Sequence, residues 1–81
     1  MNLAVRMLHM LREMGIAEGR QLASHLTPDY KELSKALQVL VARDLVDVKG
    51  DASNAPRLPS TFVAYRPSNE QRVEEFLMSA G

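Results

Sequence analysis

The side chains that could do catalytic or metal chemistry are few in this sequence, and their spacing suits neither task. Ser24 directly precedes His25, and adjacent residues of a helix point about 100° apart, so this histidine cannot act as the base for that hydroxyl. His9 shares no metal-ligand spacing with His25 or with a carboxylate. Glu74 and Glu75 are also adjacent, and we expect both to face solvent. The sequence therefore predicts no enzymatic activity and no metal site.

The chain also lacks cysteine. This excludes a disulfide framework, a thiolate metal site and a cysteine nucleophile, and it makes a reducing cytoplasm the expected compartment. The four glycines form no phosphate-cradling loop. The first residues are interrupted by charges such as Arg6 and do not resemble a signal peptide, and no apolar run has the length of a membrane span. We expect a cytoplasmic protein without a cofactor.

Length and charge limit the possible partners. An 81-residue chain forms one domain at most and has a small core, so dimerisation is an expected source of further stability. Ten Lys and Arg balance ten Asp and Glu, but residues 1–66 carry a net charge of +2 and residues 67–81 carry −2. Most dedicated nucleic-acid-binding domains are far more basic. The charge therefore counts slightly against a nucleic-acid partner.

Apolar periodicity predicts three helices in the first half of the chain. Residues spaced by three and four predict a helix over 2–14, which Gly15 ends. A shorter apolar edge predicts a two-turn helix over 20–26. Thr27 and Pro28 are typical of a helix start, so a third helix is expected over 28–43. At 100° per residue, Lys31, Lys35, Gln38 and Ala42 then lie opposite its apolar side.

The second half predicts a β-ribbon and a last helix. Residues 45–49 and 61–66 are rich in β-branched and aromatic side chains and flank a Gly- and Pro-containing loop at 50–60. A capping pattern at Ser68 and Gln71 starts a helix over 69–79. The predicted core comprises Leu3, Met7, Leu11, Ile16, Leu22, Ala23, Leu26, Leu33, Leu37, Leu40, Leu45, Val48, Phe62 and Ala64.

This order of elements resembles the winged helix-turn-helix superfamily. Residues 22–26 (LASHL) and 33–46 (LSKALQVLVARDLV) carry the resemblance, which extends over nearly the whole chain, although Asp44 stands where the family often has glycine. It implies a mainly α fold with a small β-ribbon: a three-helix core, a two-stranded antiparallel wing at 45–66 and a C-terminal helix. The helix-turn-helix would span 20–43 of a single domain, 1–81. A pure three-helix bundle is the alternative, but it leaves residues 45–66 unexplained.

The resemblance implies a DNA-binding face. The helix that starts at Pro28 would lie in the major groove, where lysine can contact phosphate or guanine and glutamine can contact adenine. The implied contact residues are Arg20, Tyr30, Lys31, Ser34, Lys35, Gln38, Lys49 and Arg57. On the charge pattern alone, the same face would be interpreted as solvated surface.

Two functions remain open. The first is a sequence-specific, DNA-binding transcriptional regulator that acts as a homodimer, because a near-neutral domain would bind a single half-site weakly. Its expected interface comprises Val5, Leu8, Phe76, Leu77 and Met78. The alternative is a winged-helix adaptor that binds a protein instead of DNA. Zero net charge, a loop whose single cation is Arg57 and the acidic end favour the adaptor.

Overall fold

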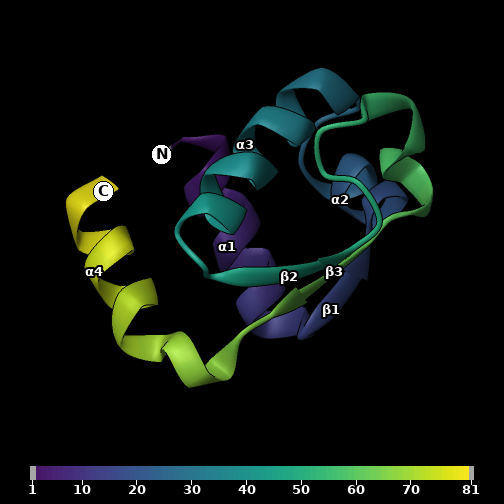
Figure 1. Ribbon diagram of the computed structural model, residues 1–81. Coiled ribbons are helices and arrows are strands. Elements are labelled where there is room, and N and C mark those ends of the chain that lie inside the picture. Colours follow the sequence, from purple (N-terminus) through teal and green to yellow (C-terminus); the bar gives the residue numbers. More distant parts are fainter. Residues whose placement is uncertain (1, 81) are drawn as a thin grey trace.

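The computed structural model describes residues 2–80 as a mainly helical fold with a small three-stranded antiparallel sheet (Figure 1). The helices and strands follow in the order α1 (Leu3–Met14), β1 (Ile16–Glu18), α2 (Gly19–His25), α3 (Tyr30–Ala42), β2 (Val46–Lys49), β3 (Phe62–Tyr65) and α4 (Glu70–Ala80). Two 3₁₀ helices, η1 (Ala55–Ser60) and η2 (Pro67–Asn69), precede β3 and α4.

Local capping explains where the long helices begin and end. The side chain of Asn2 accepts a hydrogen bond from the backbone N–H of Val5 (2.9 Å), and Gly15 ends α1 with a φ of 80°. The predicted start of α3 is wrong by two residues: Asp29, not Thr27, caps this helix. Its carboxylate accepts hydrogen bonds from the backbone N–H groups of Lys31 (3.0 Å) and Glu32 (3.4 Å). One carboxylate thereby satisfies two otherwise unpaired donors.

The predicted two-stranded ribbon is part of a three-stranded sheet. β3 lies in the centre, with β1 on one side and β2 on the other, and Val63 of β3 is opposite both Ala17 and Val48. The prediction missed β1 because a strand of three residues is too short to display an alternating pattern, and its partner is distant in sequence. Ile16, predicted as a core residue, is 53% exposed on the outer face of the sheet.

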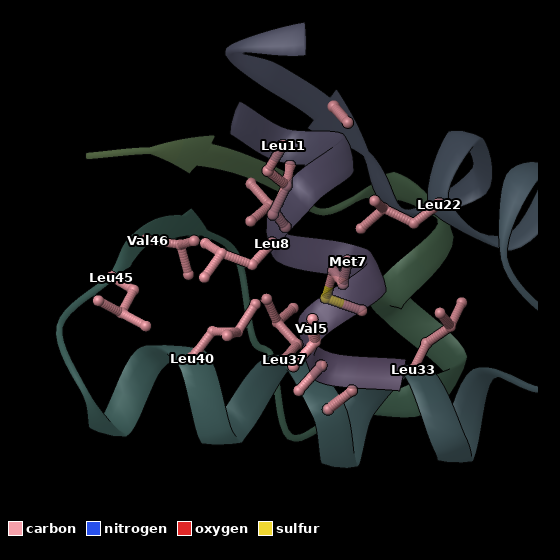
Figure 2. Close-up of a cluster of buried hydrophobic side chains, with 14 of the residues drawn as sticks. Val5, Met7, Leu8, Leu11, Leu22, Leu33, Leu37, Leu40, Leu45 and Val46 are labelled. Atoms are coloured by element: carbon pink, nitrogen blue, oxygen red, sulfur yellow. The ribbon is translucent and has the colours of Figure 1, made fainter. Parts of the chain in front are cut away.

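The core lies between α1, α3 and the sheet (Figure 2). Seven predicted core residues are confirmed as buried: Met7, Leu11, Leu22, Leu33, Leu37, Leu40 and Leu45. In β3 the predicted phase is wrong, because Val63 points inward whereas Phe62 is 45% exposed. Neighbouring residues of a strand face opposite sides, so an error of one residue exchanges the inner and outer faces.

The helix α1 buries a wider face than its main apolar stripe suggested. Val5 and Leu8 are buried among the side chains of the core (Figure 2), so their predicted role in a dimer interface is wrong. A helix that contacts both α3 and the sheet has little side-chain surface left for a second chain. Of the other three predicted interface residues, Phe76 is buried, Leu77 is half-buried and Met78 is 84% exposed.

The 50–60 loop folds back onto the helices instead of extending freely. Its 3₁₀ helix η1 packs against α2 and α3, and Leu58 is completely buried. Gly19, the first residue of α2, permits this contact: a Cβ atom at this position would lie 1.7 Å from the carbonyl oxygen of Leu58. The loop is therefore part of the packed body.

Polar contacts hold the start of α4. The hydroxyl of Tyr65 donates to the carboxylate of Glu70, which also pairs with Arg12 of α1. Burial, followed by this hydrogen bond, raises the pKa of Tyr65 to about 12, while the same bond lowers the pKa of Glu70. The carboxylate of Asp44 accepts a hydrogen bond from the guanidinium of Arg66 at 2.5 Å. Asp44 has a φ of 62°, a left-handed conformation that aspartate tolerates better than most residues.

Candidate nucleic-acid interface

The outer face of α3 carries the polar side chains predicted for it. Lys31, Lys35 and Gln38 are exposed, while Leu33 and Leu37 of the same helix are completely buried. The prediction of which side of this helix faces solvent is therefore confirmed. Two ammonium groups and one amide on a single helical face provide hydrogen-bond donors for phosphate or base edges, and the amide adds an acceptor.

The charge of this face is nearly balanced. The ammonium group of Lys35 lies 3.6 Å from the carboxylate of Glu32, and both side chains are exposed. An exposed ion pair of this kind contributes at most about 1 kcal/mol, so Lys35 can exchange Glu32 for another anion at little cost. Asp29 stabilises the start of α3 through two N–H groups.

Ser34 does not belong to the exposed face, and its predicted direct contact with DNA is wrong. Only 5% of the residue is exposed. Its hydroxyl donates to the carbonyl of Ala52 and accepts a hydrogen bond from Nε2 of Gln38 at 3.0 Å. The 50–60 loop covers this position, which sequence spacing on α3 could not reveal. Tyr30 is half-buried and packs against the core.

The remaining predicted cations lie on other elements. Arg20, in the first turn of α2, is exposed and contacts Glu18 (3.1 Å) and the carbonyl of Pro59 (3.4 Å). The fold therefore places Arg20 beside η1, the 3₁₀ helix that carries Arg57, which is also exposed. Lys49 is exposed at the end of β2, opposite Phe62 on the outer face of the sheet.

A turn in the 50–60 loop is fixed by Asp51. Its carboxylate accepts hydrogen bonds from the N–H (2.9 Å) and the hydroxyl (2.5 Å) of Ser53. These bonds, aided by the charge of Arg57, lower the pKa of Asp51. The carbonyl of Ala52, which Ser34 contacts, lies within this turn.

The sequence interpretation missed two features at the C-terminal end of α3. Arg43 follows the helix, and its guanidinium lies 5.4 Å from the ring centroid of Phe76 in α4. Val39 and Val41 of α3 are both more than 40% exposed. The apolar character of Val39, next to the polar stripe, was the available signal for an additional apolar surface.

An apolar groove runs beside the polar stripe of α3. It has a volume of about 280 Å³ and lies between α1, α3 and α4. Its apolar lining consists of Leu3, Ala4, Ala36, Val39 and Phe76. Glu32 and Lys35 stand at the same groove, so it adjoins the candidate interface.

Comparisons of the chain with protein-family models, with curated proteins and with solved structures give no match. Within residues 2–80, no helix combines the length and apolar character needed to cross a membrane. The same part of the chain contains no group of three or more His, Asp or Glu side chains suited to hold a metal ion.

Proposed function

We propose that this chain is a winged helix-turn-helix domain that binds double-stranded DNA through α3 and acts as a transcriptional regulator. The order of the elements supports the fold: α2 and α3 form the helix-turn-helix, and β1, β3 and β2 form a sheet that closes the core. The observation that carries the function is the exposed stripe of Lys31, Lys35 and Gln38 on α3.

In this proposal α3 enters the major groove with the polar stripe facing the bases. Lys31 and Lys35 contact phosphate or guanine, and Gln38 contacts a base edge. Arg20 and Arg57, which belong to neighbouring elements, supply phosphate contacts at the flank of α3. Because binding depends on these cations, the affinity for DNA should fall as salt is added. Because the cations are few, a second copy of the chain on a palindromic site should increase the affinity.

The test compares duplex binding by the wild type and by the double variant Lys31→Gln, Lys35→Gln over a range of salt concentrations, with random-sequence DNA. Each lost phosphate contact reduces the slope of log affinity against log salt by roughly 0.9. We expect a reduction of roughly 1 to 2 for the double variant, with weaker binding at low salt.

Arg6→Gln is the control for the general effect of lost charge. Arg6 is exposed on α1, on the side away from the core residues of this helix. Its loss should change the slope far less than the changes in α3. If the control and the double variant lowered the affinity equally, or if the double variant bound as the wild type does, α3 would not be the DNA-binding element.

The groove beside Lys35 favours one alternative, a winged-helix adaptor that binds a protein. Its lining by Leu3, Val39 and Phe76 suits an apolar side chain of a partner, and Lys35 and Glu32 at its side suit polar contacts. Binding through such a surface would weaken little as salt rises, whereas phosphate binding would weaken steeply. Absence of duplex binding at low salt would favour the adaptor.

A further inference from the structure

A chain of hydrogen bonds connects the exposed face of α3 to the 50–60 loop. Nε2 of Gln38 donates to Oγ of Ser34 at 3.0 Å, and the hydroxyl of Ser34 donates to the carbonyl of Ala52. Gln38 is exposed, whereas Ser34 is buried beneath the loop. A buried hydroxyl thereby joins a solvent-facing amide to a backbone carbonyl eighteen residues away.

The chemistry of the three groups allows only one direction for this chain. A backbone carbonyl accepts hydrogen bonds and cannot donate, so the single proton of the Ser34 hydroxyl is committed to Ala52. Oγ of Ser34 can then only accept from Gln38. The side chain of Gln38 must present Nε2, and not Oε1, toward Ser34, because two acceptors would otherwise face each other.

The Ala52 carbonyl that sets this direction is itself held in place. Asp51 and Ser53 form a turn on either side of it, through bonds of 2.9 and 2.5 Å. Ala52 packs against the core, and Leu58 anchors the second half of the loop there. The loop thus provides a fixed acceptor for Ser34.

We propose that Ser34 is a positioning residue that holds Gln38 in the orientation needed to recognise adenine in the major groove. This inference rests on the proposed function. After donating one hydrogen to Ser34, the amide of Gln38 still offers its second Nε2 hydrogen and Oε1. Adenine presents the complementary pair in the major groove, the acceptor N7 and the donor N6. Lys31 and Lys35, which precede Gln38 on the same exposed face, contact the phosphates of the DNA beside that base.

The test begins with selection of duplexes from a randomised pool by the wild type and by Ser34→Ala, Ser34→Thr and Gln38→Ala. We expect the wild type to select adenine at one position and Gln38→Ala to lose that preference. Ser34→Ala should reduce the preference for adenine about tenfold, because the side-chain amide of Gln38 can then rotate by about 180°. Ser34→Thr keeps the hydroxyl and should retain the preference. Ser79→Ala on α4 removes a serine hydroxyl elsewhere and should have no effect.

A second measurement uses only the wild type and Gln38→Ala. Replacing the selected adenine by 7-deazaadenine removes N7 and should weaken wild-type binding about tenfold, without effect on Gln38→Ala. This comparison does not depend on the folding of the Ser34 variants. Equal losses for both proteins, or none for the wild type, would overturn the reading of adenine by Gln38.

Side-chain amide NMR of the free protein tests the hydrogen bond between Gln38 and Ser34 independently of DNA binding. Ser34→Ala should shift the Nε2 resonances of Gln38, whereas Ser34→Thr and Ser79→Ala should shift them far less. If Ser34→Ala left both these resonances and the selected sequence unchanged, the inference would be overturned while DNA binding stood. If the wild type selected no duplex, the proposed function would fail together with the role of Gln38, even where NMR reported the hydrogen bond.

Discussion

At the scale of single residues, burial decides what a polar side chain can do. Ser34 and Gln38 both lie on the polar side of α3 in the sequence pattern, but the loop covers Ser34 and leaves Gln38 exposed. The hydroxyl of Ser34 therefore donates its hydrogen bond within the fold, whereas the side chain of Gln38 keeps hydrogen-bonding groups available for a ligand. The exposed lysines were predictable from helical spacing, but the covering of Ser34 was not.

At Gly19 the backbone of α2 lies against the backbone of η1. We expect Gly19→Ala to lower the free energy of unfolding by about 3 kcal/mol, because its Cβ would lie 1.7 Å from the backbone oxygen of Leu58. Chemical denaturation would measure this change. Gly15→Ala is the matched control: no atom lies within 4 Å of its added Cβ, and only its backbone conformation (φ 80°, ψ −53°) opposes the change, at about 1 to 3 kcal/mol. A smaller loss for Gly19→Ala than for Gly15→Ala would contradict the close packing of η1 on α2.

At the scale of elements, contacts between distant segments determine how the loop and α4 are placed. The 50–60 loop was expected from its Gly and Pro residues, but its packing through Leu58 depends on a site formed by α2 and α3. The start of α4 is tied to α1 by Arg12 and Glu70 and to β3 by Tyr65. Because such ties join side chains far apart in the sequence, local patterns do not report them.

The bond between Tyr65 and Glu70 predicts how stability depends on pH. The pKa of Glu70 is lower in the folded protein than its ordinary value of 4.5, so its contribution to stability is present above pH 4.5 and is lost as the pH falls. The pKa of Tyr65 is raised to about 12, so its contribution is present below about pH 10 and is lost as the pH rises toward 12.

Thermal unfolding of the wild type and of Glu70→Gln would test this dependence. The wild type should lose stability below pH 4.5 more steeply than the variant, which has no carboxylate at this position. Glu75→Gln, which removes an exposed carboxylate of the same helix, is the matched control and should behave as the wild type does. Parallel curves for the wild type and Glu70→Gln would exclude a role for Glu70 in holding α4.

At the scale of the whole molecule, the remaining exposed apolar surface limits how two copies could meet. Val5 and Leu8 are core residues, so the proposed dimer depends on α4, where Leu77 is half-buried and Met78 is exposed. The same fold leaves the polar stripe of α3 uncovered. A dimer through α4 is therefore compatible with DNA contact through α3.

Light scattering at high micromolar concentration would test the dimer. We expect twice the monomer mass for the wild type and the monomer mass for Met78→Glu, which should remain folded but unfold at a lower temperature because it lacks the stabilising effect of the dimer. Leu8→Ala should instead lower the free energy of unfolding by about 2 to 5 kcal/mol, because this side chain is completely buried in the core. A monomeric wild type would contradict the dimer. The proposal would then be that a single domain binds DNA.

The sequence alone was sufficient to predict α1, the exposed face of α3 and most of the leucines in the core, because a helical repeat of 3.6 residues records the buried side within a few turns. It did not predict β1, the inner face of β3 or the burial of Ser34, and it assigned Val5 and Leu8 to a dimer interface although both are buried. Each of these depends on a partner that is distant in the sequence: β3 for β1, the loop for Ser34, and α3 with the sheet for α1. Tertiary structure decided them, because a strand needs a neighbour to complete its hydrogen bonds and a side chain is buried only when another element covers it.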